Sequence, residues 1–140
     1  MILLDTNVIS ELMRPQPEPK VLAWADALDP EAVAITAMNE AEILHGLARL
    51  PDGRRKRELL QSWDALMAEL FARRILAFTS EAAHWYAELL CRRERAGRSM
   101  ATADAVIAAT ALAHGACLAT RDGADFADLG LALINPWNPT

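Results

Sequence analysis

The sequence predicts an α/β fold, a three-layer α/β/α sandwich in which helices cover both faces of a central parallel sheet. Short apolar runs of strand length alternate with longer amphipathic segments, and strands that alternate with helices form βαβ units. Hydrophobic residues make up 53% of the 140 residues, enough to build one core. The length suits a single domain over residues 1–140.

Five apolar runs have the length of strands and are bounded by polar, glycine or proline residues. They are residues 2–4, 32–35, 75–78, 117–120 and 131–134. The prolines at 136 and 139 lack the backbone donor that a strand needs, so the tail cannot extend the last strand. In parallel sheets of this kind, ligands bind beyond the carboxyl ends of the strands.

The helices are placed by their periodicity and by the residues at their ends. Thr6 is expected to cap a helix through Met13, which the prolines at 15, 17 and 19 end. The other predicted helices are residues 20–28, residues 36–51 with Thr36 as cap, residues 53–71, residues 80–97 with Ser80 as cap, and a helix that Ser99 or Thr102 caps and Gly115 ends; a turn follows at Asp122-Gly123.

Charge and composition exclude several classes of protein. The net charge of −5 argues against a protein that coats nucleic acid through a basic surface. The basic runs at 54–57 and 92–98 fit either a solvated helix face or a local contact to RNA. The residues before Asp5 do not resemble a signal peptide, so none is expected, and no apolar run approaches the ~20 residues of a membrane helix. Cys91 and Cys117 are interpreted as buried free thiols of a cytoplasmic protein.

Two aspartates directly follow predicted strands. Asp5 ends the first apolar run and is either a helix cap or a site residue. Asp122 follows the strand at 117–120 and is either a turn residue before Gly123 or a site residue. Because both strands end at the same edge of a parallel sheet, their carboxylates are expected at that edge.

Asp104 opens a helix that carries no charge from residue 105 to residue 112. Such a helix is expected to be buried nearly all round. An ionised carboxylate there pays a desolvation cost of several kcal/mol, of which the helix N-terminus offsets only ~0.3–1 kcal/mol. A metal ion or a salt-bridge partner must therefore compensate the charge.

A fourth carboxylate lies on the helix after the second strand. Periodicity does not decide whether Glu40 or Glu42 points toward the site, and Gly46 permits close packing beside it. Oxygen ligands of this kind suit Mg²⁺ or Mn²⁺, whereas Zn²⁺ prefers His or Cys, and the three histidines show no ligand spacing. An acidic metal site commonly serves phosphate chemistry, in which the metal activates water.

Five segments, in this order and spacing, resemble the PIN-domain family, and specifically the VapC/FitB-like toxins of bacterial toxin–antitoxin pairs. They are residues 3–10 (LLDTNVIS), 41–46 (AEILHG), 103–111 (ADAVIAATA), 119–126 (ATRDGADF) and 135–137 (NPW). The resemblance spans nearly the whole chain. It implies a single PIN domain with a PIN-like α/β/α sandwich around a parallel sheet.

By position, Asp5, Glu42 and Asp104 match the metal-binding acids of the family, and this selects Glu42 by resemblance alone. The subfamily pattern Thr-Arg-Asn-x-x-Asp-Phe is Thr-Arg-Asp-x-x-Asp-Phe here. Either Asp122 or Asp125 is therefore the fourth acid, and Asp122 is preferred because it directly follows a strand.

Supporting residues follow from the same comparison. Thr6 and Thr120 match positions that orient the acids or a water molecule in this family. Arg92, Arg93 and Arg98 are predicted to position the RNA backbone, because they precede the helix of Asp104.

The resemblance implies an Mg²⁺- or Mn²⁺-dependent endoribonuclease that forms a homodimer and acts as a toxin. A cognate antitoxin would insert a segment at the active site and would alone contact operator DNA. In the expected mechanism, Asp5, Asp104 and Asp122 hold a metal ion that lowers the pKa of a bound water. Glu42 holds a second ion or the water that attacks the RNA phosphodiester.

Other classes fit less well. Phosphatases with an aspartyl nucleophile need a second Asp two residues after the first, and this position is Asn7. Receiver domains need a lysine opposite the acids, and neither Lys20 nor Lys56 ends a predicted strand. A non-catalytic binding module on a PIN fold is the alternative, and the retention of all four acids argues against it.

Overall fold

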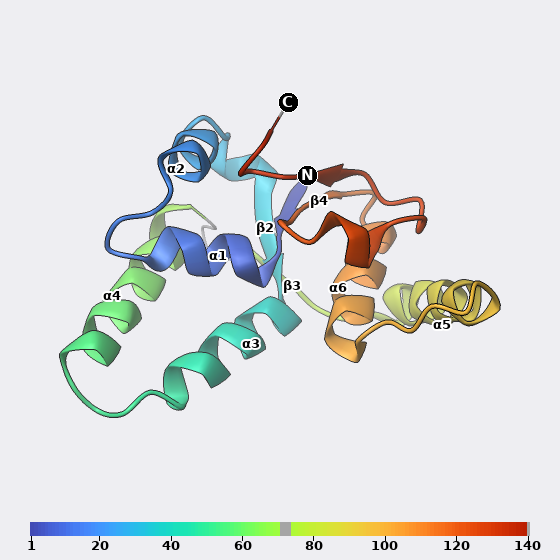
Figure 1. The fold of residues 1–140 in the computed structure, drawn as a ribbon, viewed down its shortest axis with the longest axis horizontal. Coiled ribbons are helices and arrows are strands. Elements are labelled where there is room, and N and C mark those ends of the chain that lie inside the picture. Colours follow the sequence, from blue (N-terminus) through green and yellow to red (C-terminus); the bar gives the residue numbers. More distant parts are fainter. Residues whose placement is uncertain (71–73, 140) are drawn as a thin grey trace.

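The computed structural model describes residues 1–70 and 74–139 and is an α/β/α sandwich, as predicted (Figure 1). Its five-stranded sheet has the order β3-β2-β1-β4-β5, and every neighbouring pair is parallel. The strands are β1 (Ile2–Leu4), β2 (Val33–Thr36), β3 (Ile75–Leu76), β4 (Cys117–Ala119) and β5 (Leu133–Ile134). The chain adds β2 and β3 on one side of β1, then returns to add β4 and β5 on the other. The topological switch point therefore lies between β1 and β4.

Helices form the two outer layers, with the first four α-helices of the described residues on one face of the sheet and the last two on the other. One face of the sheet is covered by α1 (Thr6–Met13), α2 (Pro19–Asp26), α3 (Ala37–Ala48) and α4 (Arg54–Glu69). The other is covered by α5 (Ser80–Arg95) and α6 (Thr102–Ala113), which pack on each other. Figure 1 shows the two groups on opposite sides of β1 and β2.

Strand geometry explains why the core forms two clusters. Successive side chains of a strand point to opposite faces of the sheet. Leu3 and Leu118 accordingly pack beneath α5 and α6, whereas Leu4 and Ala119 pack beneath the layer of α1–α4. The helix after Asp104 is buried, as predicted, since residues 105 and 107–111 of α6 are all buried. Both helical layers thus pack against the same short strands.

Several predicted boundaries need correction. The N-cap of α1 is Asp5 and not Thr6, and the N-cap of α5 is Thr79 and not Ser80, because these side chains accept the free backbone N–H groups of the first turn. Helix α6 has Ala101 at its N-cap position, with no side-chain cap from Ser99 or Thr102. Thr36 caps α3 as predicted, although it also ends β2.

The remaining differences concern element ends and the thiols. Strands 2 to 5 and the helices differ from their predicted ends by up to three residues, and the predicted end of the helix at 53–71 lies outside the described residues. The segment after Asp122 forms a short 3₁₀ helix (Gly123–Phe126) instead of a simple turn. Cys91 is exposed and Cys117 is half-buried, so the thiols are free as predicted but not buried. Within residues 1–70 and 74–139, no helix is long and apolar enough to cross a membrane.

Candidate active site

Asp5 lies at the centre of the candidate site, at the carboxyl end of the central strand. Its backbone N–H donates to the carbonyl oxygen of Ala119, which extends the pairing of β1 with β4 by one residue. Asp5 is only 6% exposed. It accepts hydrogen bonds from the Thr6 backbone N–H (2.8 Å) and from the Thr120 hydroxyl (2.7 Å). Asp5 is therefore the helix cap that the sequence offered as one alternative, and its position leaves it available as a site residue as well.

Thr120 and Asn7 connect Asp5 to Asp122. The Thr120 hydroxyl accepts a hydrogen bond from the backbone N–H of Asp122 (3.0 Å) while it donates to Asp5. The Asn7 amide donates to a carboxylate oxygen of Asp122 (3.0 Å) and lies 3.5 Å from a carboxylate oxygen of Asp5. Two acids from opposite sides of the switch point are thus held together by neutral donors.

Glu42 reaches the same edge from α3. The Thr6 hydroxyl donates to the Glu42 carboxylate at 2.7 Å and accepts from the side-chain amide of Asn39 at 3.1 Å. Asn39 is fully buried, and its own oxygen accepts from the backbone N–H and the hydroxyl of Thr36. Its NH₂ group must therefore face Thr6, which directs the Thr6 hydroxyl hydrogen toward Glu42. This geometry supports Glu42 over Glu40.

Asp104 approaches from the first turn of α6. Its side chain is half-buried and lines a cavity of about 270 Å³ together with Asp125, Arg98 and Arg93. Both candidates for the fourth acid therefore lie near the others. Asp122 shares a hydrogen-bond network with Asp5, whereas Asp125 faces the cavity beside Asp104.

Burial and neighbouring negative charges raise the pKa of two acids of the site, Asp5 and Asp104. Burial raises the pKa of Asp5, whereas its hydrogen bonds from Thr120 and Thr6 lower it. Burial, and after it the negative charges of Asp5, Asp125, Glu42 and Asp122, together raise the pKa of Asp104 to about 6. Within residues 1–70 and 74–139, none of these acids forms an ion pair with Lys, Arg or His. Their charge therefore remains uncompensated by the protein.

The donor set fits a hard divalent cation. Carboxylate oxygens are the ligands that Mg²⁺ and Mn²⁺ prefer, and a nearby cation would offset the repulsion that raises the pKa of Asp104. In the arrangement described for residues 1–70 and 74–139, no three His, Cys, Asp or Glu side chains converge closely enough to form a ready-made ligand group. The chemistry of the donors therefore supports a metal site, although the side chains are not yet gathered around one point.

Arg92 and Arg93, predicted to contact RNA, have other partners. Arg92 is exposed on α5 and lies 3.5 Å from Glu88 in an ion pair. Arg93 is only 4% exposed, and its guanidinium donates to the carbonyl oxygens of Asp125 (2.7 Å) and Ala127 (3.1 Å). The expectation that Arg93 faces RNA is corrected, because its side chain ties α5 to the segment after β4.

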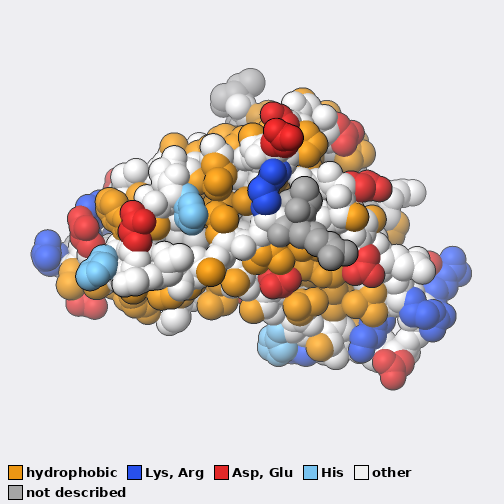
Figure 2. Space-filling view, turned by 180° about the vertical axis from the view of Figure 1, so that it is seen from behind, with side chains coloured by type: hydrophobic (Ala, Val, Ile, Leu, Met, Phe, Trp, Pro, Cys, Tyr) orange, Lys and Arg blue, Asp and Glu red, His pale blue; other side chains and the backbone are white. Residues whose placement is uncertain are grey.

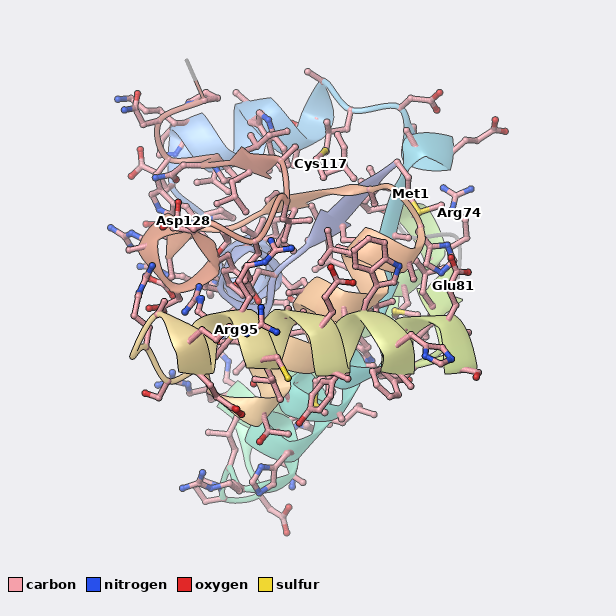
Figure 3. All side chains as sticks on the ribbon, turned by 90° about the vertical axis from the view of Figure 1, so that its right-hand side faces the viewer. Met1, Arg74, Glu81, Arg95, Cys117 and Asp128 are labelled. Atoms are coloured by element: carbon pink, nitrogen blue, oxygen red, sulfur yellow. The ribbon has the colours of Figure 1, made fainter. Side chains whose placement is uncertain are left out.

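Arg98 is an exposed member of the group that lies beside an acid of the site. It pairs with Asp128 at 3.2 Å and lines the cavity of Asp104. Figure 3 shows Asp128 toward the same end of α5 as Arg95, the C-terminal end from which the chain leads to Arg98. On the face seen in Figure 2, Lys and Arg side chains gather mainly toward the two ends and form no continuous stripe.

A larger cavity, of about 560 Å³, opens beside Glu42 between α1, α3 and α4. Its walls are mostly apolar, and Thr6, Asn7 and Glu42 line it on the side that faces the other acids. Arg121 and Trp137 also line it, and the guanidinium carbon of Arg121 lies 4.8 Å from the centre of the Trp137 ring.

Sequence reasoning missed four residues of this site. Asn7 was considered only as the missing second Asp of a phosphatase, and Asn39 was not considered. The spacing Thr36-x-x-Asn39 is a variant of the capping box, which the structure confirms for α3, and it was a usable signal. The pair of Arg121 and Trp137 joins residues 16 positions apart, and no local pattern signals it.

Comparisons with known proteins agree with the sequence resemblance. Residues 2–130 match the PIN domain. The VapC ribonuclease Y4jK of Sinorhizobium fredii is 42% identical over 139 residues, which cover 99% of both chains. The toxin FitB of Neisseria gonorrhoeae is 44% identical over 138 residues, again covering 99% of both chains.

A solved structure shows the same fold. The structure of FitAB bound to an IR36 DNA fragment contains a chain with 43% sequence identity and a TM-score of 0.90. The match covers 99% of this chain and 96% of the other. The α/β/α architecture is thus shared over the full length of both molecules.

Replacement of Asp104 by Asn tests whether the buried negative charge of Asp104 destabilises the fold. The pKa of Asp104 is about 6 in the folded state, above the ordinary value of 3.8. The contribution of Asp104 to the free energy of unfolding therefore falls as the pH rises from about 4 to about 6, and it stays low at higher pH. In EDTA at pH 8, Asp104→Asn should therefore unfold at a temperature at or above that of wild type. The gain should shrink as the pH falls from 6 toward 4, as measured by thermal denaturation.

The control for this experiment is Asp64→Asn, which makes the same charge change at an exposed position of α4. It should show no comparable dependence on pH. If Asp104→Asn melts well below wild type in EDTA at pH 8, Asp104 is a structural ion-pair partner and not a strained site residue.

Proposed function

The chain belongs to the PIN-domain family, and from this premise we propose that it is a divalent-metal-dependent endoribonuclease, the toxin of a toxin–antitoxin pair. The observation that carries the proposal is that acids from the ends of β1 and β4 and from α3 and α6 are neighbours at the switch point of the sheet. Their charges are close enough to raise the pKa of Asp104, and no basic side chain of the described residues pairs with them.

Each acid has a distinct part in the proposed site. Asp5, Asp104 and Asp122 hold one Mg²⁺ or Mn²⁺ ion, and Asp125 is the alternative to Asp122. A bound ion of this kind supplies a lowered pKa for water and neutralises charge that develops on a phosphate. Glu42 holds a second ion or accepts a hydrogen bond from the attacking water, in an orientation that Thr6 fixes.

Neutral side chains hold the acids Asp5 and Asp122 in place. The Thr120 hydroxyl donates to Asp5 and so favours its charged form. Asn7 donates to Asp122 and orients its carboxylate without adding positive charge that would compete with the ion. Partners of this kind around metal ligands typically contribute about 10–100-fold to metal affinity or activity. Hydrolysis by water needs no covalent intermediate on the protein.

The proposed partners follow from the relatives. FitB is named a toxin, and the solved FitAB complex is bound to DNA. By analogy, this chain forms a homodimer, is inhibited by a cognate antitoxin that inserts a segment at the acids, and reaches operator DNA only through that antitoxin. With RNA as its substrate, the protein is proposed to act in the cytoplasm.

Metal dependence is tested with purified protein and a mixed single-stranded RNA substrate. Cleavage should require Mg²⁺ or Mn²⁺ and stop in EDTA, whereas Ca²⁺ should bind but support poor turnover because its coordination is loose. Asp5→Asn and Glu42→Gln should each abolish cleavage. Glu40→Gln, on the same helix two residues before Glu42, is the matched control and should keep it. Full activity in chelator, or loss of activity in the control alone, refutes this site.

Assembly is tested by sedimentation. The isolated chain is expected to be a homodimer at micromolar concentration. Co-expression with the product of an adjacent small reading frame should give a larger complex without nuclease activity. A monomer would contradict the first expectation, and undiminished cleavage by the complex would contradict the second.

A further inference from the structure

Arg121 is the basic residue nearest to the acids along the chain, since Thr120 precedes it and Asp122 follows it. Its backbone N–H donates to the side-chain oxygen of Asn7 at 3.3 Å, which ties its backbone to the network that holds Asp122. Its side chain is exposed and lines the cavity that Thr6, Asn7 and Glu42 border. A positive charge is therefore fixed at the rim of an acidic site.

Arginines beside carboxylates commonly form ion pairs, but Arg121 forms none with the residues that the structure describes. Its guanidinium instead lies over the Trp137 ring, with the guanidinium carbon 4.8 Å from the ring centre. A cation–π contact holds the group in place without cancelling its charge. Arg14, in the wall of the same cavity, differs in this respect because it pairs with Glu11 at 3.0 Å.

The indole platform is itself fixed by the fold. The backbone N–H of Trp137 donates to the side-chain oxygen of Asn135 at 3.0 Å. The ring is half-buried and packs against the cluster beneath α1–α4. The C-terminal segment after β5 thus supplies a ring, packed on the core, for a side chain that begins at the end of β4.

We propose that Arg121, held by Trp137, binds a phosphate group of the RNA strand next to the phosphate that is cleaved. The inference rests on the proposed ribonuclease function. A polyanion that approaches the acids is repelled by them, and a fixed guanidinium at the rim offsets this repulsion. The planar guanidinium matches the geometry of phosphate oxygens, and such contacts position the strand without reading its bases. Trp137 is a positioning residue that acts through Arg121.

The test measures the binding of a fluorescent single-stranded oligouridylate to the full chain in Ca²⁺, by anisotropy, over a range of KCl concentrations. Arg121→Gln should weaken binding roughly tenfold at low salt. It should also reduce the slope of log affinity against log salt by about 0.7, the value for one phosphate contact to a single strand. Arg121→Lys keeps the charge and should keep most of the slope.

Two further variants separate the proposed roles from a general loss of charge or structure. Lys20→Gln makes the same charge change on α2, which contributes no residue to the cavity, and should leave affinity and slope unchanged. Trp137→Leu should weaken binding, and the double variant with Arg121→Gln should bind no more weakly than Arg121→Gln alone. Additive losses would show that Trp137 does not act through Arg121 and would overturn its role.

The outcomes also distinguish this inference from the proposed function. If wild type cleaves RNA but Arg121→Gln binds with unchanged affinity and slope, the phosphate contact is refuted and the ribonuclease function stands. If Arg121→Gln instead loses only binding to the antitoxin, Arg121 belongs to a protein interface and the proposal is overturned. If wild type neither binds nor cleaves RNA, both proposals fail.

Discussion

The burial of the Asp5 carboxylate is the constraint on which the arrangement around the site depends. Asp5 is only 6% exposed, and its carboxylate needs several hydrogen-bond donors because an unpaired buried charge is strongly destabilising. The donors come from the first turn of α1 and from the end of β4. Asp5 can therefore be satisfied only where β1 and β4 are adjacent, which is the switch point of the sheet.

The donors that satisfy the acids are all electrically neutral. Hydroxyl, amide and backbone N–H groups fix the directions of Asp5, Asp122 and Glu42 but leave their negative charges in place. The guanidinium of Arg121, which directly precedes Asp122 in the chain, is held over an indole ring instead of a carboxylate. An arrangement that orients carboxylates without neutralising them is suited to bind a cation, and it costs folding stability until the cation binds.

Most of the fold follows from local rules in the sequence. The strands alternate with helices of clear periodicity, and the uncharged run after Asp104 predicts the buried helix that the structure shows. The sequence also predicts the edge of the sheet at which the acids lie, because the carboxyl ends of parallel strands share one edge. Periodicity did not choose between Glu40 and Glu42, since that choice depends on the contact of Thr6 with a helix 36 residues away. Arg93 was misjudged for a similar reason, because its partners are backbone carbonyls more than 30 residues away.

The central claim is that the crowded acids are the binding site of a divalent cation. Calorimetric titration of wild type with Mn²⁺, in buffers of different ionisation enthalpy, tests it most directly. Because the pKa of Asp104 is about 6, binding at pH 6 should release roughly half a proton, and binding at pH 8 should release almost none. A failure to bind Mn²⁺, or a proton release that is the same at both pH values, would contradict the account.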